Sequence, residues 1–250
     1  MSQNQKKIWI TGASSGIGKA VAEKFAKEGW KVAVSARRKE LLDELAKNPN
    51  IKSFPLDVTN RSQINEVFKN IKDGFGDLDL CLFSSGTYEP KDEQSIDPDK
   101  IKNVMNVNFL GVIDCVKSVE DYFKNRRSGH ISIVSSIAGY RGLPNSSGYG
   151  PSKAALTNFS ESIYFDFKKF GVRVSVVSPG FIKTPLTDKN EFPMPFLRSP
   201  EFAADKVYNG LVKSRSFEIH FPKQLTMTLK FLRILPYRVY LFLVDKLVKR

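Results

Sequence analysis

Three side chains in the middle of the chain have the types and spacing of a proton-transfer site. Tyr149 and Lys153 stand four residues apart in GYGPSKAALTNFSESIYFDF, which is predicted to be one long helix, so both side chains lie on one helix face. A phenol with a pKa near ~10 exchanges protons poorly at neutral pH, but an ammonium beside it favours phenolate and lowers that pKa. Ser136 ends the apolar run ISIVSS, so its hydroxyl is expected at the carboxyl end of a buried strand, where open α/β sheets bind ligands.

The N-terminal segment has the pattern of a dinucleotide-binding turn. A short apolar strand, KKIWI, runs into TGASSGIG and then into KAVAEKFAKEG, whose apolar residues recur at helical spacing. In that context Gly12 allows a tight turn, Gly16 lets the backbone approach a pyrophosphate, and Gly18 permits close packing of helix on strand. The free N–H groups of the helix N-terminus face the phosphates. The predicted cofactor contacts here are Gly12, Ser14, Ser15, Gly16, Ile17 and Gly18.

The end of the second predicted strand, WKVAVSARR, indicates which dinucleotide binds. In NAD-specific proteins a carboxylate at this place holds the ribose 2′-hydroxyl. Here the chain has Ala36, Arg37 and Arg38 and no carboxylate. A guanidinium binds phosphate through charge-assisted hydrogen bonds, so NADP(H) is predicted over NAD(H), with Arg37 on the 2′-phosphate and Arg38 stacked on adenine. The alternative interpretation is two exposed arginines at a helix start.

The glycine turn and the Ser136, Tyr149 and Lys153 set together resemble the short-chain dehydrogenase/reductase family, from about Lys6 to Phe221. The resemblance implies an enzyme that interconverts a small-molecule ketone or aldehyde with an alcohol. It implies that Tyr149 is the general acid or base, that Lys153 lowers its pKa and holds the nicotinamide ribose, and that Ser136 orients the substrate carbonyl. A homodimer or homotetramer is expected, because members of this family commonly form one.

The same resemblance assigns roles to further residues. It implies that Asn108 holds a helix carbonyl and a water that links the lysine to solvent. The remaining implied cofactor contacts are Asp57 and Val58 at the adenine, Ser85 and Gly86 through their backbone, and Pro179, Gly180, Ile182 and Thr184 beside the nicotinamide.

The chain departs from the family pattern in two places. Ser84-Ser85-Gly86-Thr87 stands where relatives have Asn-Asn-Ala-Gly, and a serine braces the sheet with less reach than the first asparagine. Ser15 stands where many NADP-preferring relatives have a basic residue, which points to a moderate preference for NADP(H).

Strand-like and helix-like segments alternate along the chain, as in a Rossmann-like, doubly wound α/β fold with a mostly parallel seven-stranded sheet. Residues 97–125 are predicted to form one long helix, capped at Asp97, with Val104, Val107, Leu110 and Val112 on its buried face. We expect one dinucleotide-binding and catalytic domain over 1–222, followed by a helical tail over 223–250.

The composition of the chain argues against nucleic-acid binding, metal binding and secretion. The formal net charge is +13, yet no recognised nucleic-acid-binding module is present, so nucleic acid is not an expected partner. With two His, and two Cys in apolar contexts, no metal site is expected. The start MSQNQKKIWI has no apolar signal-peptide segment, which favours a cytoplasmic location.

The tail from Lys223 to Arg250 carries seven Lys or Arg and one acid, Asp245, with apolar residues at helical spacing. It is predicted to be a basic amphipathic helix, interrupted at Pro236, that lies on the inner face of a membrane. The equally weighted alternative is a helix that packs on a neighbouring subunit or on its own substrate mouth.

The loop 136–148 and the proline-rich segment 185–200 are expected to line the substrate pocket. Tyr140, Leu143 and Pro144 would give an apolar wall, and Phe192, Met194 and Phe196 the underside of a mobile lid. These features predict a hydrophobic substrate, such as a lipid, sterol or long acyl ketone. The alternative functions are a non-catalytic nucleotide-binding regulator and a membrane-surface or nucleic-acid binder that uses the tail.

Overall fold

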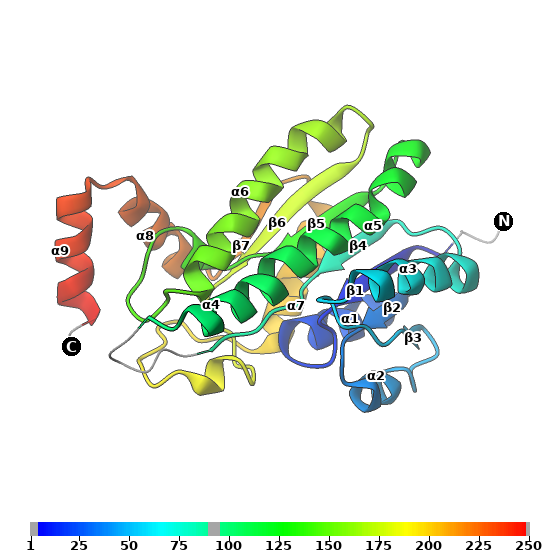
Figure 1. Cartoon of the computed structure of the whole chain (residues 1–250), viewed down its shortest axis with the longest axis horizontal. Coiled ribbons are helices and arrows are strands. Elements are labelled where there is room, and N and C mark those ends of the chain that lie inside the picture. Colours follow the sequence, from blue (N-terminus) through cyan, green and yellow to red (C-terminus); the bar gives the residue numbers. More distant parts are fainter. Residues whose placement is uncertain (1–4, 90–95, 249–250) are drawn as a thin grey trace.

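The computed structural model describes residues 5–89 and 96–248, and these form a seven-stranded sheet with helices on both faces (Figure 1). The strand order is β3-β2-β1-β4-β5-β6-β7, and each neighbouring pair is parallel. The strands are β1 (Lys7–Thr11), β2 (Lys31–Ser35), β3 (Ile51–Ser53), β4 (Leu80–Phe83), β5 (His130–Val134), β6 (Arg173–Pro179) and β7 (Glu218–Phe221). The predicted Rossmann-like, doubly wound fold is thereby confirmed.

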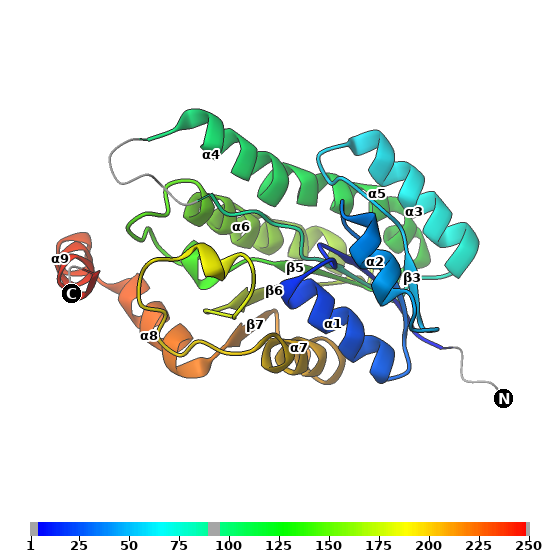
Figure 2. The same ribbon diagram turned by 90° about the horizontal axis from the view of Figure 1, so that it is seen from below.

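The helices divide between the two faces of the sheet (Figure 2). On one face lie α3 (Arg61–Phe75), α5 (Gly111–Arg126) and α6 (Tyr149–Lys168), and on the other lie α1 (Gly16–Lys27) and α7 (Pro200–Tyr208). The remaining helical elements are α2 (Lys39–Leu45), α4 (Pro98–Met105), η1 (Asn106–Leu110), η2 (Ile137–Gly139), η3 (Thr187–Lys189), η4 (Asn209–Lys213), α8 (Lys223–Ile234) and α9 (Tyr237–Val248).

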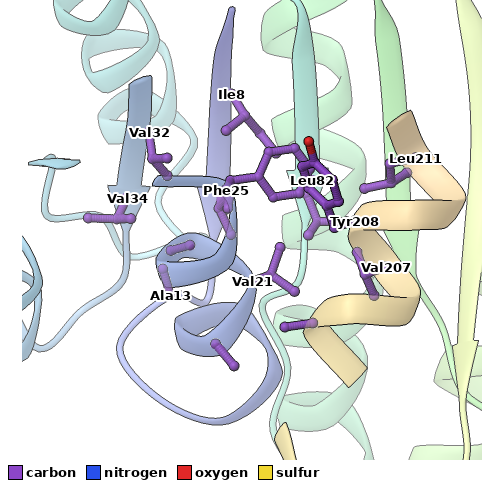
Figure 3. Packing of buried hydrophobic residues seen from close by; sticks show 14 of the residues in the cluster. Ile8, Ala13, Val21, Phe25, Val32, Val34, Leu82, Val207, Tyr208 and Leu211 are labelled. Atoms are coloured by element: carbon purple, nitrogen blue, oxygen red, sulfur yellow. The ribbon is translucent and has the colours of Figure 1, made fainter. Parts of the chain in front are cut away.

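The apolar core between α1, α7 and the sheet fixes the direction in which α1 leaves the glycine turn (Figure 3). The Phe25 side chain is fully buried, and its ring lies edge-on to Trp30 and Tyr208, with both centroids 5.0 Å away. Burial of a phenyl ring contributes roughly 1.5–3 kcal/mol, so this contact anchors the helix. As a result, the N-terminus of α1 is held at the carboxyl edge of the sheet.

The predicted helix over residues 97–125 forms, but a π-helical turn, η1, interrupts its regular winding. The Asp97 carboxylate accepts from the N–H groups of Asp99 and Lys100, so the predicted cap is confirmed. The predicted buried face is wrong at Leu110, which is 49% exposed, whereas Val104 and Val112 are buried. The reason is the wider π turn, which shifts the helical phase between those two valines.

The C-terminal tail forms two helices, α8 and α9, which project at one end of the molecule (Figures 1 and 2). The break falls at Leu235 and Pro236, where the sequence predicts an interruption. Within 5–89 and 96–248, no helix is both long and apolar enough to cross a membrane.

Candidate active site

A cavity of about 690 Å³ lies over the carboxyl ends of the central strands. Its size falls within the roughly 300–1,000 Å³ typical of small-molecule and cofactor sites. Among its described lining residues, Arg37, Arg38, Lys153 and Lys189 are cationic, and Asp57 is the one carboxylate. This charge balance suits a ligand that carries several phosphates.

The glycine turn forms one wall of this cavity, at the point where the strand order reverses between β1 and β4. Gly12 has φ +69°, and a Cβ on it would lie 2.6 Å from the carbonyl oxygen of Ser84. Thr11 supports the same crossing, because its hydroxyl accepts from the Ser84 N–H at 3.2 Å. A side chain at Gly12 would therefore separate the two loops that meet beneath the ligand site.

Arg38 reaches from the end of β2 to the glycine turn. Its guanidinium donates to the hydroxyls of Ser14 and Ser15, each at 2.9 Å. A positive charge therefore stands beside Ser15, although this position in the turn is not itself basic. Arg37 is exposed and also lines the cavity.

Tyr149 begins α6 and faces the same cavity from the other side. Burial raises the pKa of its phenol to about 12, and a hydrogen bond with Ser136 acts in the opposite direction. Ser136 is buried, and its hydroxyl also accepts from the Ala138 N–H at 3.2 Å. The Tyr149 hydroxyl therefore keeps its proton at neutral pH in this arrangement.

Lys153 is 4% exposed, and its Nζ donates to the Val134 carbonyl at 2.9 Å. Burial lowers its pKa to about 8. The Nζ atom lies 5.6 Å from the centre of the Tyr149 ring. The expected lowering of the Tyr149 pKa by Lys153 is not met here, because loss of hydration dominates the phenol and the amine is directed to the backbone of β5.

Asn108 lies in the π turn, fully buried behind the cavity. Its Oδ1 accepts from the Thr87 N–H at 2.7 Å, and its Nδ2 donates to the Thr87 carbonyl and to Ser152 Oγ, each at 3.0 Å. The expected partner was a helix carbonyl, and the structure gives the backbone of a loop instead. Asn108 thus holds the loop that follows β4, in which Gly86 comes between the Asn108 amide and the Lys153 amine.

Comparison with known proteins places this geometry in a family. The family model described as short chain dehydrogenase matches residues 6–193. The chain belongs to the short-chain dehydrogenase family. Its relatives include an uncharacterized oxidoreductase of Myxococcus xanthus, 33% identical over 91% of both chains. A 3-oxoacyl-[acyl-carrier-protein] reductase, FabG, of Thermotoga maritima is 35% identical over 72% of this chain and 75% of the relative.

Among solved structures, the protein ElxO with NADP bound superposes with a TM-score of 0.77. It is 27% identical, and the match covers 86% of this chain and 97% of that one. As a short-chain dehydrogenase, the chain is an oxidoreductase of the NAD(P)-dependent type.

Most residues predicted for this short-chain dehydrogenase site lie together, and a few do not. The lining of the cavity includes Gly12, Ser14, Ser15, Gly16, Ile17, Gly18, Arg37, Arg38, Asp57, Val58, Ser85, Gly86, Tyr149, Lys153, Pro179 and Thr184. The predicted residues that are not among its lining residues are Asn108, Ser136, Gly180 and Ile182. The Gly180 N–H donates to the Phe221 carbonyl at 2.7 Å, and the Ile182 carbonyl accepts from the Thr187 hydroxyl at 2.7 Å.

Two residues near the reacting groups escaped sequence reasoning. The Tyr88 ring packs edge-on against Tyr149, with centroids 5.4 Å apart, and the Tyr88 side chain is buried. Lys189 lines the cavity from the segment after β6 and donates to the Tyr88 carbonyl at 3.0 Å. The sequence position of Tyr88 could have indicated its place, because it directly follows the Ser-Ser-Gly-Thr loop, whose backbone is predicted to contact the cofactor.

The substrate side differs from the expected apolar wall and lid. Tyr140 is buried, but its hydroxyl donates to Glu218 Oε1 at 2.5 Å, and Pro144 is exposed. The Phe192 ring lies 6.0 Å from the Phe181 ring, as a lid contact would, whereas Phe196 is 49% exposed. A small apolar cluster does form beside Ser136, from Ile137, Tyr140, Leu225, Phe181 and Leu229.

Proposed function

We propose that this short-chain dehydrogenase is an NADP(H)-dependent oxidoreductase that interconverts a ketone or aldehyde with an alcohol. One observation carries the proposal: the Tyr149 phenol, hydrogen-bonded to Ser136, opens on the same cavity as the glycine turn and its arginines. A proton donor and a phosphate-binding turn on one cavity are the two parts that carbonyl reduction by a nicotinamide needs. The similarity to ElxO, whose structure was solved with NADP bound, supports the cofactor class.

The residues present fit such a cofactor. The first N–H groups of α1 and the backbone at Gly12 and Gly16 would hold the pyrophosphate. The sequence predicts Arg37 on the 2′-phosphate and Arg38 on the adenine. We propose Arg38 for the 2′-phosphate instead, with Arg37 beside it, because the Arg38 guanidinium already lies at the glycine turn, 2.9 Å from the hydroxyls of Ser14 and Ser15. Two guanidiniums here favour NADP(H) over NAD(H). Asp57 and Val58 would contact the adenine, and Pro179 and Thr184 the nicotinamide end. Bound there, the nicotinamide supplies or accepts the hydride at the carbonyl carbon.

The side chains of the chain itself account for the proton and the developing charge. Because the pKa of Tyr149 is about 12, its hydroxyl is protonated at pH 7 and can donate to the carbonyl oxygen during reduction. The Ser136 hydroxyl gives a second donor to the same oxygen. Two donors held in place before the reaction stabilise the forming alkoxide without reorganisation. Lys153, largely charged below a pKa of about 8, adds positive charge near the ring.

We also propose a hydrophobic substrate, such as a lipid, sterol or long acyl ketone. Support comes from the apolar cluster that begins at Ile137, next to Ser136, and continues through Phe181 to Leu225 and Leu229 of α8. The Thermotoga maritima relative is named for a 3-oxoacyl substrate, a ketone on an acyl chain. The same proposal includes a homodimer or homotetramer in the cytoplasm, with the tail available to the inner face of a membrane.

The test is NADPH oxidation by the purified chain over ketones and aldehydes of graded chain length, with NADH as the comparison cofactor. Turnover that rises with chain length, and is faster with NADPH, is the expected result. Equal rates on small polar and long-chain carbonyls would contradict the hydrophobic substrate. Tight NADPH binding without turnover on any carbonyl would instead identify a nucleotide-binding regulator.

A further inference from the structure

The outer face of α8 carries an apolar stripe that no described residue covers. Met227, Phe231 and Ile234 follow one another at spacings of four and three residues, so they share one helix face. Their exposed fractions are 57%, 61% and 77%. Large apolar side chains that gather on one exposed face mark an interaction surface rather than ordinary scattered exposure.

The apolar surface continues onto α9. Val239, Leu241 and Phe242 are 45%, 60% and 62% exposed, while Tyr240 and Val244 of the same helix are buried against the protein. The α9 helix therefore has an inner face that attaches it and an outer face on which these apolar side chains are exposed between Arg238 and Lys246. We call the exposed residues of both helices the tail surface: Met227, Phe231, Ile234, Val239, Leu241 and Phe242.

Basic residues surround the tail surface and decide which partner fits it. Lys223, Arg233, Arg238 and Lys246 are exposed on the two helices. The tail sequence has seven Lys or Arg against the single Asp245, in a chain of net charge +13. In a symmetric contact between two copies, this excess of positive charge would face itself. An anionic lipid headgroup layer over acyl chains instead matches both the cations and the apolar stripe.

The tail surface is held in a fixed place relative to the substrate loop by Arg141. Its guanidinium donates to the carbonyls of Leu232, Arg233 and Leu235 at 3.0, 3.2 and 2.7 Å, where α8 ends. It also lies 4.6 and 4.0 Å from the ring centres of Tyr237 and Tyr240. The Tyr240 hydroxyl donates to the Gly142 carbonyl at 2.6 Å. Both helices are thus fastened to the loop that leads from Ser136 to Tyr149.

We propose that the tail surface docks on the headgroup layer of an anionic lipid bilayer, with the apolar stripe inserted and the basic residues on the lipid phosphates. The docking itself is independent of the reaction. The delivery of an apolar substrate from the bilayer rests on the proposed function. Since the tail and the loop after Ser136 are joined, docking holds the substrate loop near the bilayer, from which an apolar substrate can enter.

The full-length chain tests the docking by co-sedimentation with phosphatidylcholine vesicles, with and without phosphatidylglycerol. Binding to the anionic vesicles that weakens with salt is expected. Phe231→Ser should lower the vesicle partition coefficient by about tenfold, since one inserted ring is lost. Phe165→Ser is the matched control, because Phe165 is 65% exposed on α6, away from the tail, and should leave binding unchanged.

Two outcomes would overturn the docking proposal. One is equal or absent binding to both vesicle types by the unchanged chain. The other is an oligomer, seen by sedimentation velocity, that the Phe231→Ser change dissociates, together with no binding of the unchanged chain to vesicles. That result would identify a second copy of the chain on the tail surface. NADPH oxidation of a water-soluble carbonyl without vesicles tests the proposed function separately, so the two failures are distinguishable.

Discussion

Two ends of the site are constructed in different ways. The dinucleotide end comprises the glycine turn, Arg38 and the Tyr149 to Lys153 turn. There two backbone segments are in close contact, since a Cβ on Gly12 would lie 2.6 Å from the Ser84 carbonyl oxygen. At the C-terminal end, comprising residues 140–148, α8 and α9, one arginine side chain joins segments that are more than 90 residues apart. Close backbone contact requires a particular residue type, so it can be recognised in the sequence. A long side chain can reach its partners from many positions, so its contacts cannot.

Replacing Tyr149 by Phe should affect the dinucleotide end most. The change removes the proton donor but keeps the ring against Tyr88, so folding and NADPH binding are expected to persist. General acid catalysis contributes ~10²–10⁴-fold, and kcat should fall by about that factor. Steady-state NADPH oxidation measures kcat, and a fluorescence titration measures cofactor binding. Near-native turnover would remove Tyr149 from the reaction.

The buried amine at the same end should make stability depend on pH. Burial lowers the pKa of Lys153 from 10.5 to about 8 in the folded chain, so between these values the unfolded chain binds more protons. The free energy of unfolding should therefore rise by about 3 kcal/mol as pH increases from 8 to 10.5, and the cost of the buried charge is fully present below pH 8.

Urea unfolding at several pH values, with Lys153→Met as the comparison, isolates this contribution. The difference in unfolding free energy between the two proteins should change through that pH window and stay constant below it. A constant difference at every pH would show that Lys153 titrates normally.

Arg38→Ala should weaken NADPH binding by about thirtyfold, which is the loss of a charge-assisted contact worth about 2 kcal/mol. The KM for NADH should hardly change, because NADH has no 2′-phosphate. Arg37→Ala, one residue away on the same cavity, tells which of the two guanidiniums carries the preference. Equal losses for NADPH and NADH in Arg38→Ala would mean that Arg38 supports the glycine turn through Ser14 and Ser15.

The smallest expected effect lies at the C-terminal end. Arg141→Ala removes half-exposed contacts to three carbonyls and two rings, so the unfolding free energy should fall by about 1–2 kcal/mol. The KM for a long-chain carbonyl should rise, with the KM for NADPH unchanged. Arg141→Lys keeps the charge but loses the planar group, and should recover only part of the loss. If the KM for NADPH rose as much as the KM for the carbonyl, the two ends of the site would not be independent.

Local patterns in the sequence predicted the fold and most of the cavity lining. Strand-like runs such as KKIWI and ISIVSS end at the polar residues that meet at one sheet edge, which follows from the parallel order. Glycines with positive φ, such as Gly12 and Gly16, have few alternatives and are therefore visible in the sequence. Asp97 caps its helix as predicted, and Ser199 caps α7 from the same position before a proline.

What the sequence could not predict depends on where long side chains point. Nothing local indicates that Lys153 donates to Val134, that Arg38 turns back to Ser15, or that Tyr140 pairs with Glu218. The π turn was missed for a related reason. An apolar period over residues 104–112 predicts a regular helix, and only the tertiary contacts of Asn108 and Gly111 explain the wider turn.

That π turn makes the helix sensitive to the number of its residues as well as to their types. A Cβ on Gly111 would lie 2.7 Å from the Val58 carbonyl, while Asn108, just before it, faces Thr87. Because a π turn holds one residue more than an α turn, removing one residue between them would restore regular winding and shift Asn108 relative to Gly111. Related chains that retain the buried amide should therefore tolerate substitutions in this stretch far better than single-residue insertions or deletions.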